Sequence, residues 1–287
     1  MLTASSFPSA ALASHCGIDI LLTGDSLAMV HLGLTDTSAL TLAEMLMFCR
    51  AVARGARDGP CFLVGDLPMG SYEISPAQAL TSAIRMIKEG RQHAVKLEGG
   101  VALAPTIRHI TTAGGIPVLA HIGLTPQRQH SLGGFRVQGK TTASALQLLE
   151  DALAVQNAGA FAVVLEAVPP QIARIITSKL HIPTIGIGAG NATSGQVLVQ
   201  ADMLGDFPPG RGLPKFVKRY GDVWGEGCRA VEAYVEEVKR GTYPREGEHT
   251  YAMPEKELAE FERVVARVKF PGREEEAGKE DQEWEKQ

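Results

Sequence analysis

Short runs of aliphatic and β-branched residues alternate with stretches of helical periodicity along most of the chain. This alternation is typical of repeated β-α units around a parallel sheet. The runs predict six clear strands, one very short strand and one weaker strand: Asp19–Thr23, Cys61–Val64, His93–Leu97, Pro117–Ala120, Ala160–Leu165, Pro183–Ile187, Leu2–Ala4 and Val197–Leu204. Eight such strands predict an α/β fold of the (β/α)8 TIM-barrel class.

Capping residues mark where several helices begin and end. Ser and Thr side chains accept hydrogen bonds from the first free N–H groups of a helix, and glycine often follows its last turn. The helices predicted in this way are one opened by the capping box of Thr41 and Glu44 and closed by Gly55, one opened by Ser75 and Pro76 and closed by Gly90, one with an apolar stripe of Leu146, Leu149 and Leu153, and one over Gln171–Lys179.

The alternation of strand and helix patterns ends beyond Pro214. It predicts a long helix from Lys215 to about Lys239 and another from Pro254 to Lys269. Residues 271–287 are charged and nearly devoid of aliphatic side chains, which is typical of a disordered tail. We therefore expect one barrel domain with extra C-terminal helices over residues 1–270, followed by an acidic tail over residues 271–287.

Composition and charge exclude several classes of protein. Of the 287 residues, 45% are hydrophobic and 21% are charged, and no apolar run approaches the roughly 18 to 20 residues of a membrane helix. The chain holds 28 Lys and Arg against 32 Asp and Glu. The charge lies mostly in the acidic tail, so the remainder is nearly neutral and offers no electrostatic basis for nucleic-acid binding. We expect neither a membrane nor a nucleic acid as a partner.

The cysteines and the first residues suggest an intracellular protein. Cys16, Cys49, Cys61 and Cys228 form no CxxC pair and no cluster with histidine, which argues against a zinc site or a disulfide framework. No targeting signal is visible at the start of the chain. The mitochondrial matrix and the cytoplasm both remain open as the compartment.

Residues capable of chemistry follow five of the predicted strands. They are Asp25, Asp66, Lys96 with Glu98, His121, and Glu166. In a parallel barrel the loops after the carboxyl ends of the strands form the active site, so we expect these side chains at one mouth. Clustered carboxylates repel one another unless a cation or a proton lies among them, and oxygen ligands suit Mg²⁺. The sequence therefore predicts a divalent metal site.

Other interpretations of single residues stay open. An Asp after a strand is often a turn former or a helix cap. Lys96 and Glu98 share one face of their strand, so Lys96 either binds an anionic group of a substrate or forms a structural ion pair. His121 lies inside an aliphatic strand and fits a core histidine as well as a catalytic one. The loop over residues 123–139 is a candidate lid.

Read together, these strand-end motifs resemble the ketopantoate hydroxymethyltransferase family. The resemblance extends from about Leu2 to Tyr251, and fungal-type members are the most similar. The chain starts short of the N-terminal helix that such members carry. The segments that carry the resemblance are Gly24–Leu27, Gly65–Pro68, Val95–Gly100, His121–Gln127, Gly133–Gly139, Leu165–Glu166, Ile185–Gly190 and Pro214–Phe216, with Asp206–Arg211 and Glu248–Pro254 for the fungal type.

The resemblance implies a hydroxymethyl transfer from 5,10-methylenetetrahydrofolate to 3-methyl-2-oxobutanoate through a Mg²⁺-stabilised enolate, giving 2-dehydropantoate for pantothenate synthesis. It implies that Asp25, Asp66 and Glu98 bind Mg²⁺. Ser26 and Lys96 would hold the keto acid, and Glu166 would be the base that removes the proton from C3. Asp25, Asp66 and His121 count as further substrate-binding residues. The family is also known for homo-oligomers, commonly decamers.

Two rival functions remain at this point. The first is another Mg²⁺-dependent 2-keto-acid barrel of the phosphoenolpyruvate mutase and isocitrate lyase type, which would want a cysteine in its lid loop; residues 123–139 hold none. The second is an inactive barrel that serves as a binding module. The joint presence of Asp25, Asp66, Lys96, Glu98 and Glu166 argues against an inactive barrel.

Overall fold

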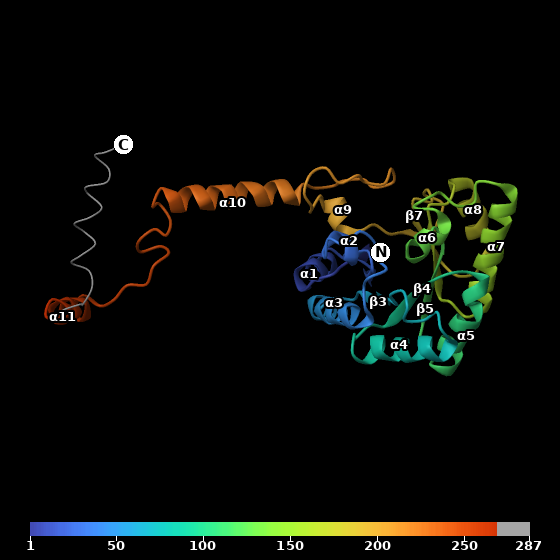
Figure 1. The fold of residues 1–287 in the computed structure, drawn as a ribbon, viewed down its shortest axis with the longest axis horizontal. Coiled ribbons are helices and arrows are strands. Elements are labelled where there is room, and N and C mark those ends of the chain that lie inside the picture. The colour runs from blue at the N-terminus through green and yellow to red at the C-terminus, as the bar shows by residue number, and fades with distance from the viewer. Residues whose placement is uncertain (269–287) are drawn as a thin grey trace. The chain divides into compact units, whose positions relative to one another are not determined.

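The computed structural model describes residues 1–268, and its centre is a parallel sheet. The sheet has eight strands in chain order from β1 to β8, every neighbouring pair parallel. Helices lie outside the strands (Figure 1). The strands are β1 (Leu2–Thr3), β2 (Ile20–Thr23), β3 (Phe62–Asp66), β4 (Ala94–Glu98), β5 (Val118–Gly123), β6 (Ala162–Glu166), β7 (Thr184–Ile187) and β8 (Gly195–Gln196). The α/β class and seven of the predicted strands are confirmed, with small shifts at their ends.

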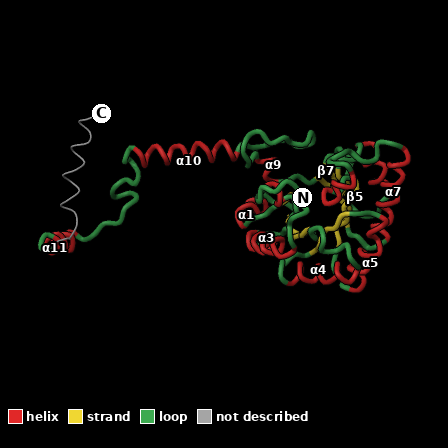
Figure 2. The backbone as a smooth tube through the Cα atoms, viewed as in Figure 1, coloured by secondary structure: helices red, strands yellow, loops and turns green. Residues whose placement is uncertain are grey.

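A backbone bridge connects the two edges of this sheet. Leu2 forms a parallel bridge with Leu198, just beyond β8, and the N–H of Thr3 donates to the carbonyl of Leu198 at 3.2 Å. The curled parallel sheet, drawn in yellow in Figure 2, is consistent with a TIM-like barrel.

The eighth strand is misplaced by the sequence pattern. The predicted strand over Val197–Leu204 is wrong, because β8 precedes it and Gln200–Leu204 forms helix α9. The first residues of that run still extend the sheet edge, since the N–H of Val197 donates to the carbonyl of Gly186 at 2.9 Å. A short apolar run fits a strand and a buried helical turn equally well, so its periodicity does not distinguish them.

Two helices of residues 1–226 begin at their predicted caps. Thr41 and Glu44 form the expected capping box of α3, and Ser75 accepts from the N–H of Gln78 at the start of α4. The helices are α1 (Phe7–His15), α2 (Leu27–Val30), α3 (Leu42–Gly55), α4 (Pro76–Lys88), α5 (Ala104–Ala113), α6 (Gln129–Leu132), α7 (Thr142–Asn157), α8 (Pro170–Lys179) and α9, with the 3₁₀ turns η1 (Val101–Leu103) and η2 (Pro126–Arg128).

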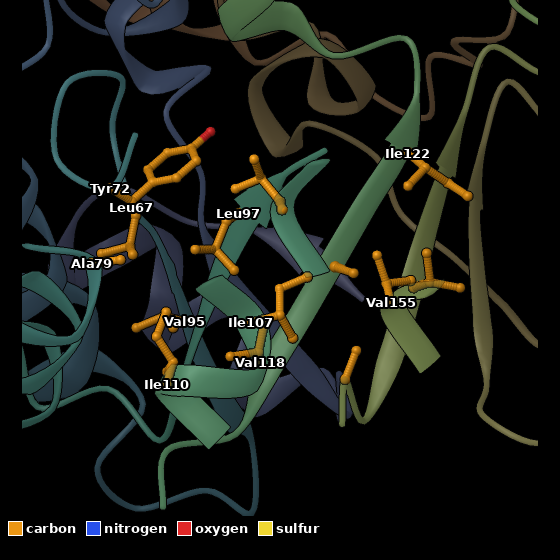
Figure 3. Packing of buried hydrophobic residues seen from close by; sticks show 14 of the residues in the cluster. Leu67, Tyr72, Ala79, Val95, Leu97, Ile107, Ile110, Val118, Ile122 and Val155 are labelled. Carbon is orange, nitrogen blue, oxygen red and sulfur yellow. The ribbon is translucent and has the colours of Figure 1, made fainter. Parts of the chain in front are cut away.

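The core consists of three clusters, one of which brings Ala13 of α1 together with Val52 of α3 and Leu21 of β2. The largest cluster packs the outer face of the sheet against the helices, as Figure 3 shows for Val95, Val118 and Ile122 with Ile107 and Ile110 of α5. The third cluster lies on the inner face of the sheet; it contains Leu22, Val64, Ala94, Leu119, Ala162, Val164, Ile185 and Val197. The period of two along each strand separates these sets.

The C-terminal part begins its first helix later than predicted. The helix expected from Lys215 is wrong over its first third, because α10 spans Val223–Lys239. The preceding segment bonds to distant backbone instead: the N–H of Tyr220 donates to the carbonyl of Met203 at 2.7 Å. The second helix, α11, is Glu255–Val265, and neither α10 nor α11 buries a residue.

The chain divides into two compact units, Met1–Glu226 and the part from Gly227 onward. The whole sheet belongs to the first unit. The end of the helix predicted to Lys269 and the predicted acidic tail lie outside the described residues. In the described part of the chain, every helix is too short or too polar to span a membrane. All four cysteines are free.

Candidate active site

Strand alternation brings the predicted site residues to the inner face of the sheet. Asp66 is the last residue of β3, Glu98 of β4 and Glu166 of β6. Lys96 and His121 lie two residues before the ends of β4 and β5. The register sets Asp66 opposite Lys96 and Glu98 opposite His121. Because every second residue faces the same side, these side chains lie above the inner-face apolar cluster, at the carboxyl ends of the strands.

The Lys96 ammonium group lies at the centre of this polar layer. Its Nζ is 3.1 Å from Oδ1 of Asp66 and 3.7 Å from Oε1 of Glu98. It is also 3.2 Å from Nδ1 of His121. Lys96 is only 4% exposed, so its charge is largely removed from water and depends on these partners.

One oxygen of each of two carboxylates is held by a backbone N–H. Asp66 Oδ2 accepts from the N–H of Asp25 at 3.0 Å, and Glu98 Oε2 accepts from the N–H of Gln127 at 3.0 Å. The other oxygens, Asp66 Oδ1 and Glu98 Oε1, are buried and face the Lys96 ammonium group. Asp66 Oδ1 pairs with it at 3.1 Å, whereas Glu98 Oε1 lies 3.7 Å away and has no hydrogen-bond partner. Glu98 Oε1 is therefore an acceptor with unused capacity.

Burial makes the ionised form of these carboxylates costly. It raises the pKa of both Asp66 and Glu98, although Lys96 acts in the opposite sense on each. Burial alone would lower the pKa of Lys96, but Asp66 and Glu98 reverse this and hold it above its ordinary value. Lys96 therefore stays charged, and the carboxylates compete for a proton or a cation.

His121 is neutral and has one tautomer that satisfies both ring nitrogens. Burial and the nearby Lys96 lower the pKa of His121 to about 4. Nε2 is 2.8 Å from the carbonyl oxygen of Leu124, which can only accept, so Nε2 carries the proton. Nδ1 then accepts from Lys96. This contact accounts for a polar side chain inside an aliphatic strand.

Glu166 stands on the other side of His121 from Lys96. Its Oε2 is 3.3 Å from His121 Nε2, and its side chain is 14% exposed, more than the other carboxylates of the cluster. Burial raises the pKa of Glu166 to about 8. A carboxylate with this pKa is a stronger base than an ordinary glutamate and is separate from Asp66 and Glu98.

The remaining sequence-predicted residues lie at the rim. Asp25 is buried, and its Oδ2 accepts from Nε2 of Gln127 at 2.8 Å. Ser26 follows it at the start of α2, half-buried, with a side chain that makes no capping hydrogen bond.

The candidate lid over residues 123–139 contains η2 and α6. Its His130 lies 3.9 Å from Asp36.

Sequence reasoning missed two buried residues of this site, Tyr72 and Gln127. Tyr72 is 1% exposed and Gln127 is 3% exposed. The hydroxyl of Tyr72 donates to Oε1 of Gln127 at 2.6 Å, and Figure 3 shows this hydroxyl turned away from the aliphatic side chains around the ring. Both residues are uncharged. The sequence did offer one signal for Gln127 as a site residue, because it lies in the loop after a strand that ends in polar residues.

The donor set fits a hard divalent cation. Asp25, Asp66 and Glu98 with Lys96 combine three carboxylates with one ammonium group, which leaves two negative charges without a partner when all are ionised. Glu98 Oε1, which is buried and has no hydrogen-bond partner, points to the same need for a cation. Over residues 1–268, no three His, Cys, Asp or Glu side chains are already grouped closely enough to hold a metal ion. Oxygen ligands of this kind suit Mg²⁺.

Comparison with known proteins shows similarity to one enzyme family. The profile of a family described as ketopantoate hydroxymethyltransferase matches residues 1–246. A 3-methyl-2-oxobutanoate hydroxymethyltransferase of Emericella nidulans is 64% identical over 265 residues, which cover 92% of this chain and 75% of that protein. The enzyme of the same name from Oleidesulfovibrio alaskensis is 52% identical over 266 residues, with 93% and 90% covered.

Solved structures show the same fold at low sequence identity. A 2,3-dimethylmalate lyase, described as a member of the PEP mutase and isocitrate lyase superfamily, matches with a TM-score of 0.53 at 17% identity, over 92% of this chain and 91% of that chain. This likeness supports the fold alone. The family profile over most of the chain and the high identity to the fungal relative show that the chain belongs to the ketopantoate hydroxymethyltransferase family.

Proposed function

We propose that the chain transfers a hydroxymethyl group from 5,10-methylenetetrahydrofolate to 3-methyl-2-oxobutanoate, giving 2-dehydropantoate for pantothenate synthesis. The single observation that carries this proposal is the arrangement of Lys96, three carboxylates and a separate basic Glu166 at one end of the sheet. The names of the relatives support the choice of substrate and donor.

Lys96 and Ser26 are the groups that bind the keto acid. The substrate carries a carboxylate, and a buried ammonium group is the charge that offsets its transfer out of water. Ser26 offers a hydroxyl next to Asp25 at the start of α2, and this hydroxyl is not used as a helix cap. Together the two residues fix the anionic end of the substrate and leave C3 free to face Glu166.

Asp25, Asp66 and Glu98 would hold Mg²⁺. When bound, the ion would act as a Lewis acid that stabilises negative charge on the keto oxygen of the substrate. The ion also offsets the repulsion among the three carboxylates, so Lys96 remains available for the substrate carboxylate.

Glu166 removes the proton from C3 beside the neutral ring of His121. The carboxylate accepts the proton at one of its oxygens, and the electron pair of the C–H bond passes into the enolate. Over the whole transfer, C3 forms a bond to the one-carbon unit, both C–N bonds of the methylene bridge break, and one water supplies the hydroxyl group; the proton from C3 and the other proton of the water end on the two nitrogens of tetrahydrofolate. His121 Nε2 lies 3.3 Å from Oε2 of Glu166, but its N–H donates to the carbonyl of Leu124, so the neutral ring lies against this carboxylate without adding a charge to it. Burial keeps the carboxylate of Glu166 basic.

The rival functions receive less support. The phosphoenolpyruvate mutase type shares the fold, but at 17% identity the match carries no activity with it. The lid residues 123–139 contain no cysteine, as expected for a hydroxymethyltransferase. An inactive barrel would not need to retain a buried lysine among carboxylates, because such a cluster stabilises a fold less than apolar residues would.

The test is an NMR measurement of deuterium exchange at C3 of 3-methyl-2-oxobutanoate in D2O with Mg²⁺ and without folate. It isolates proton removal from transfer. We expect the wild-type enzyme to exchange C3, and Glu166→Gln to lower the exchange rate at least a hundredfold while calorimetry still detects keto-acid binding. The matched control Glu89→Gln, at an exposed ion pair on α4, should exchange at the wild-type rate.

Two outcomes decide the proposal, and a third tests the control variant. Absence of exchange and of product formation in the wild-type enzyme would refute the proposed activity. Exchange near the wild-type rate in Glu166→Gln would remove Glu166 as the base and make His121 the next candidate. Product formed by the wild-type enzyme but no exchange in either variant would indicate that the control itself is defective and must be replaced by another exposed Glu→Gln substitution.

The same proposal includes a homo-oligomer, with the decamer as its expected size. Exposed apolar side chains on the C-terminal helices, among them Trp224, Tyr234 and Phe261, support a protein partner for these surfaces. We propose the mitochondrial matrix or the cytoplasm as the compartment. Residues 1–270 as one domain and residues 271–287 as an acidic tail also remain proposals.

A further inference from the structure

Gln127 hydrogen-bonds to residues at the carboxyl ends of three other strands of the site. Its backbone N–H donates to Glu98 Oε2 at 3.0 Å. Its side-chain Nε2 donates to Asp25 Oδ2 at 2.8 Å and to the carbonyl oxygen of Leu67 at 3.0 Å. Asp25 and Leu67 follow β2 and β3, Glu98 is the last residue of β4, and Gln127 itself follows β5. One glutamine therefore fixes two of the three carboxylates that are the candidate ligands of Mg²⁺.

The orientation of this amide is determined by its neighbours. Nε2 faces two acceptors, a carboxylate oxygen and a carbonyl oxygen, and both of its hydrogens are used. Oε1 receives the hydroxyl hydrogen of Tyr72 at 2.6 Å. The reversed amide would set Oε1 against two acceptors and leave the hydroxyl of Tyr72 facing an N–H group, so one rotamer is strongly favoured.

Tyr72 is held in turn by the backbone of β4. Its hydroxyl oxygen lies 3.4 Å from the backbone N of Glu98, which donates to it. The ring is buried in the large core cluster, next to Leu67 in Figure 3. A hydroxyl on a rigid, buried ring therefore sets the position of the amide, and the amide sets the position of Asp25.

Gln127 therefore holds one oxygen of each of two carboxylates. Asp25 Oδ2 is committed to Gln127, and Glu98 Oε2 is committed to the backbone of the same residue. Glu98 Oε1 is left without a hydrogen bond and faces Lys96. We propose that Gln127, locked by Tyr72, is a positioning residue that presents Asp25 and Glu98 to the divalent cation. This inference rests on the proposed function, because it assumes that these carboxylates bind the cation.

The experiment compares two buried glutamines of the same fold. Gln92 is 2% exposed, and its Nε2 also makes two hydrogen bonds, to the carbonyl oxygens of Cys49 and Gly90. Neither of these hydrogen bonds goes to a residue of the candidate site. Gln127→Met and Gln92→Met therefore remove the same kind of group at similar burial. Tyr72→Phe removes only the hydroxyl that holds the amide of Gln127.

The readout is the affinity for Mn²⁺, measured by electron paramagnetic resonance without substrate, together with kcat, KM and thermal unfolding. We expect Gln127→Met to bind Mn²⁺ about 10 to 100 times more weakly, as is typical when a partner of a metal ligand is lost. Tyr72→Phe should weaken binding in the same direction by a smaller factor. Gln92→Met should lower the melting temperature and keep the wild-type Mn²⁺ affinity. High Mn²⁺ should restore activity to Gln127→Met.

The outcomes separate this inference from the proposed function. If the wild-type enzyme forms product and binds Mn²⁺ but Gln127→Met and Tyr72→Phe bind it equally well, the positioning role is wrong and the function stands. If the wild-type enzyme neither forms product nor binds Mn²⁺, both fail. If Gln127→Met does not fold, the affinity of Tyr72→Phe decides: an unchanged value overturns the positioning role. Equal losses of affinity in Gln127→Met and Gln92→Met also overturn it.

Discussion

Lys96 carries the only ammonium charge that contacts Asp66 and Glu98 within residues 1–268. Replacement of one partner in a buried ion cluster leaves the others without compensation, which typically costs about 3 kcal/mol or more. We therefore expect Lys96→Met to lower the free energy of unfolding at pH 7 by roughly that amount, measured by urea denaturation. The exposed Lys140→Met is the control and should change stability by less than about 0.5 kcal/mol.

The pH dependence of this loss distinguishes charge from packing. At pH 5 the carboxyl groups of Asp66 and Glu98, whose pKa values are raised by burial, are protonated and need no cation. The destabilisation by Lys96→Met should then be smaller than at pH 7. An equal loss at both pH values would mean that Lys96 contributes through its aliphatic stem alone.

At the scale of single residues, the sequence identified the charged members of the site but not the neutral members that act through hydrogen bonds. The rule that parallel strands end at the active site was enough to select Asp66, Lys96, Glu98, His121 and Glu166, and the structure brings them together. Their chemical roles stay predictions. Tyr72 and Gln127 escaped because a neutral side chain leaves no charge signal, and its importance depends on a rotamer that only packing defines.

Helix α7 shows what periodicity can and cannot define. The stripe of Leu146, Leu149 and Leu153 correctly predicted a helix, yet its buried residues are Leu148, Ala152 and Val155. Leu146 is 56% exposed. Together with Ile172 and Ile175 of α8 it lines a surface groove of about 360 Å³. Two apolar stripes on one helix make its orientation undecidable from the sequence, because each satisfies the helical period.

This arrangement predicts opposite results for two leucines on one helix. Leu148 is 6% exposed, so Leu148→Ala should lower the free energy of unfolding by about 2 to 4 kcal/mol. Leu146→Ala should cost less than about 1 kcal/mol, since alanine and leucine have similar helix propensity and little area is lost. Chemical denaturation of both variants provides the measurement. A larger loss for Leu146→Ala would show that the groove is covered in the native assembly.

Elements with their own capping signals were predictable, and elements defined by distant partners were not. The capping box of α3 is a local feature that the structure reproduces. The eighth strand is different, because β8 has two residues and the following sheet contacts depend on Gly186 and Thr3. The segment before α10 is also fixed by distant backbone, that of Met203. Local periodicity contains no information about such bonds.

In the first unit, buried charged side chains gather at the carboxyl ends of the strands of a closely packed sheet. Its inner apolar cluster fills one end of the sheet interior and the polar layer lies at the carboxyl ends of the strands. Because charged groups are stabilised by water, the burial of this layer costs folding free energy. The same strands therefore carry an apolar layer that stabilises the fold and, at their carboxyl ends, a charged layer that destabilises it.

Stability as a function of pH should report this cost. Burial raises the pKa of Glu166 to about 8, so between pH 4.5 and 8 the folded state retains a proton that the unfolded chain has released. The free energy of unfolding attributable to Glu166 therefore falls as the pH rises through this window. His121, with a pKa lowered to about 4, acts in the opposite sense only up to about pH 6.5. The half-buried ammonium group of Met1 also opposes the decline, since its pKa is lowered.

The difference between Glu166→Gln and the wild-type protein isolates the contribution of this one carboxyl group. Without divalent cations we expect nearly equal stability at pH 5, where Glu166 is protonated and resembles glutamine. By pH 8.5 Glu166→Gln should be more stable by on the order of 1 to 4 kcal/mol, because each unit of pKa shift corresponds to about 1.4 kcal/mol. Urea denaturation at several pH values measures this difference, and Mg²⁺ should raise the stability of the wild-type protein at pH 8.5 by mass action. A difference that stays constant from pH 5 to pH 8.5 would show that Glu166 is ionised across this range in the folded protein, and the buried, basic carboxylate required for proton removal would then be absent.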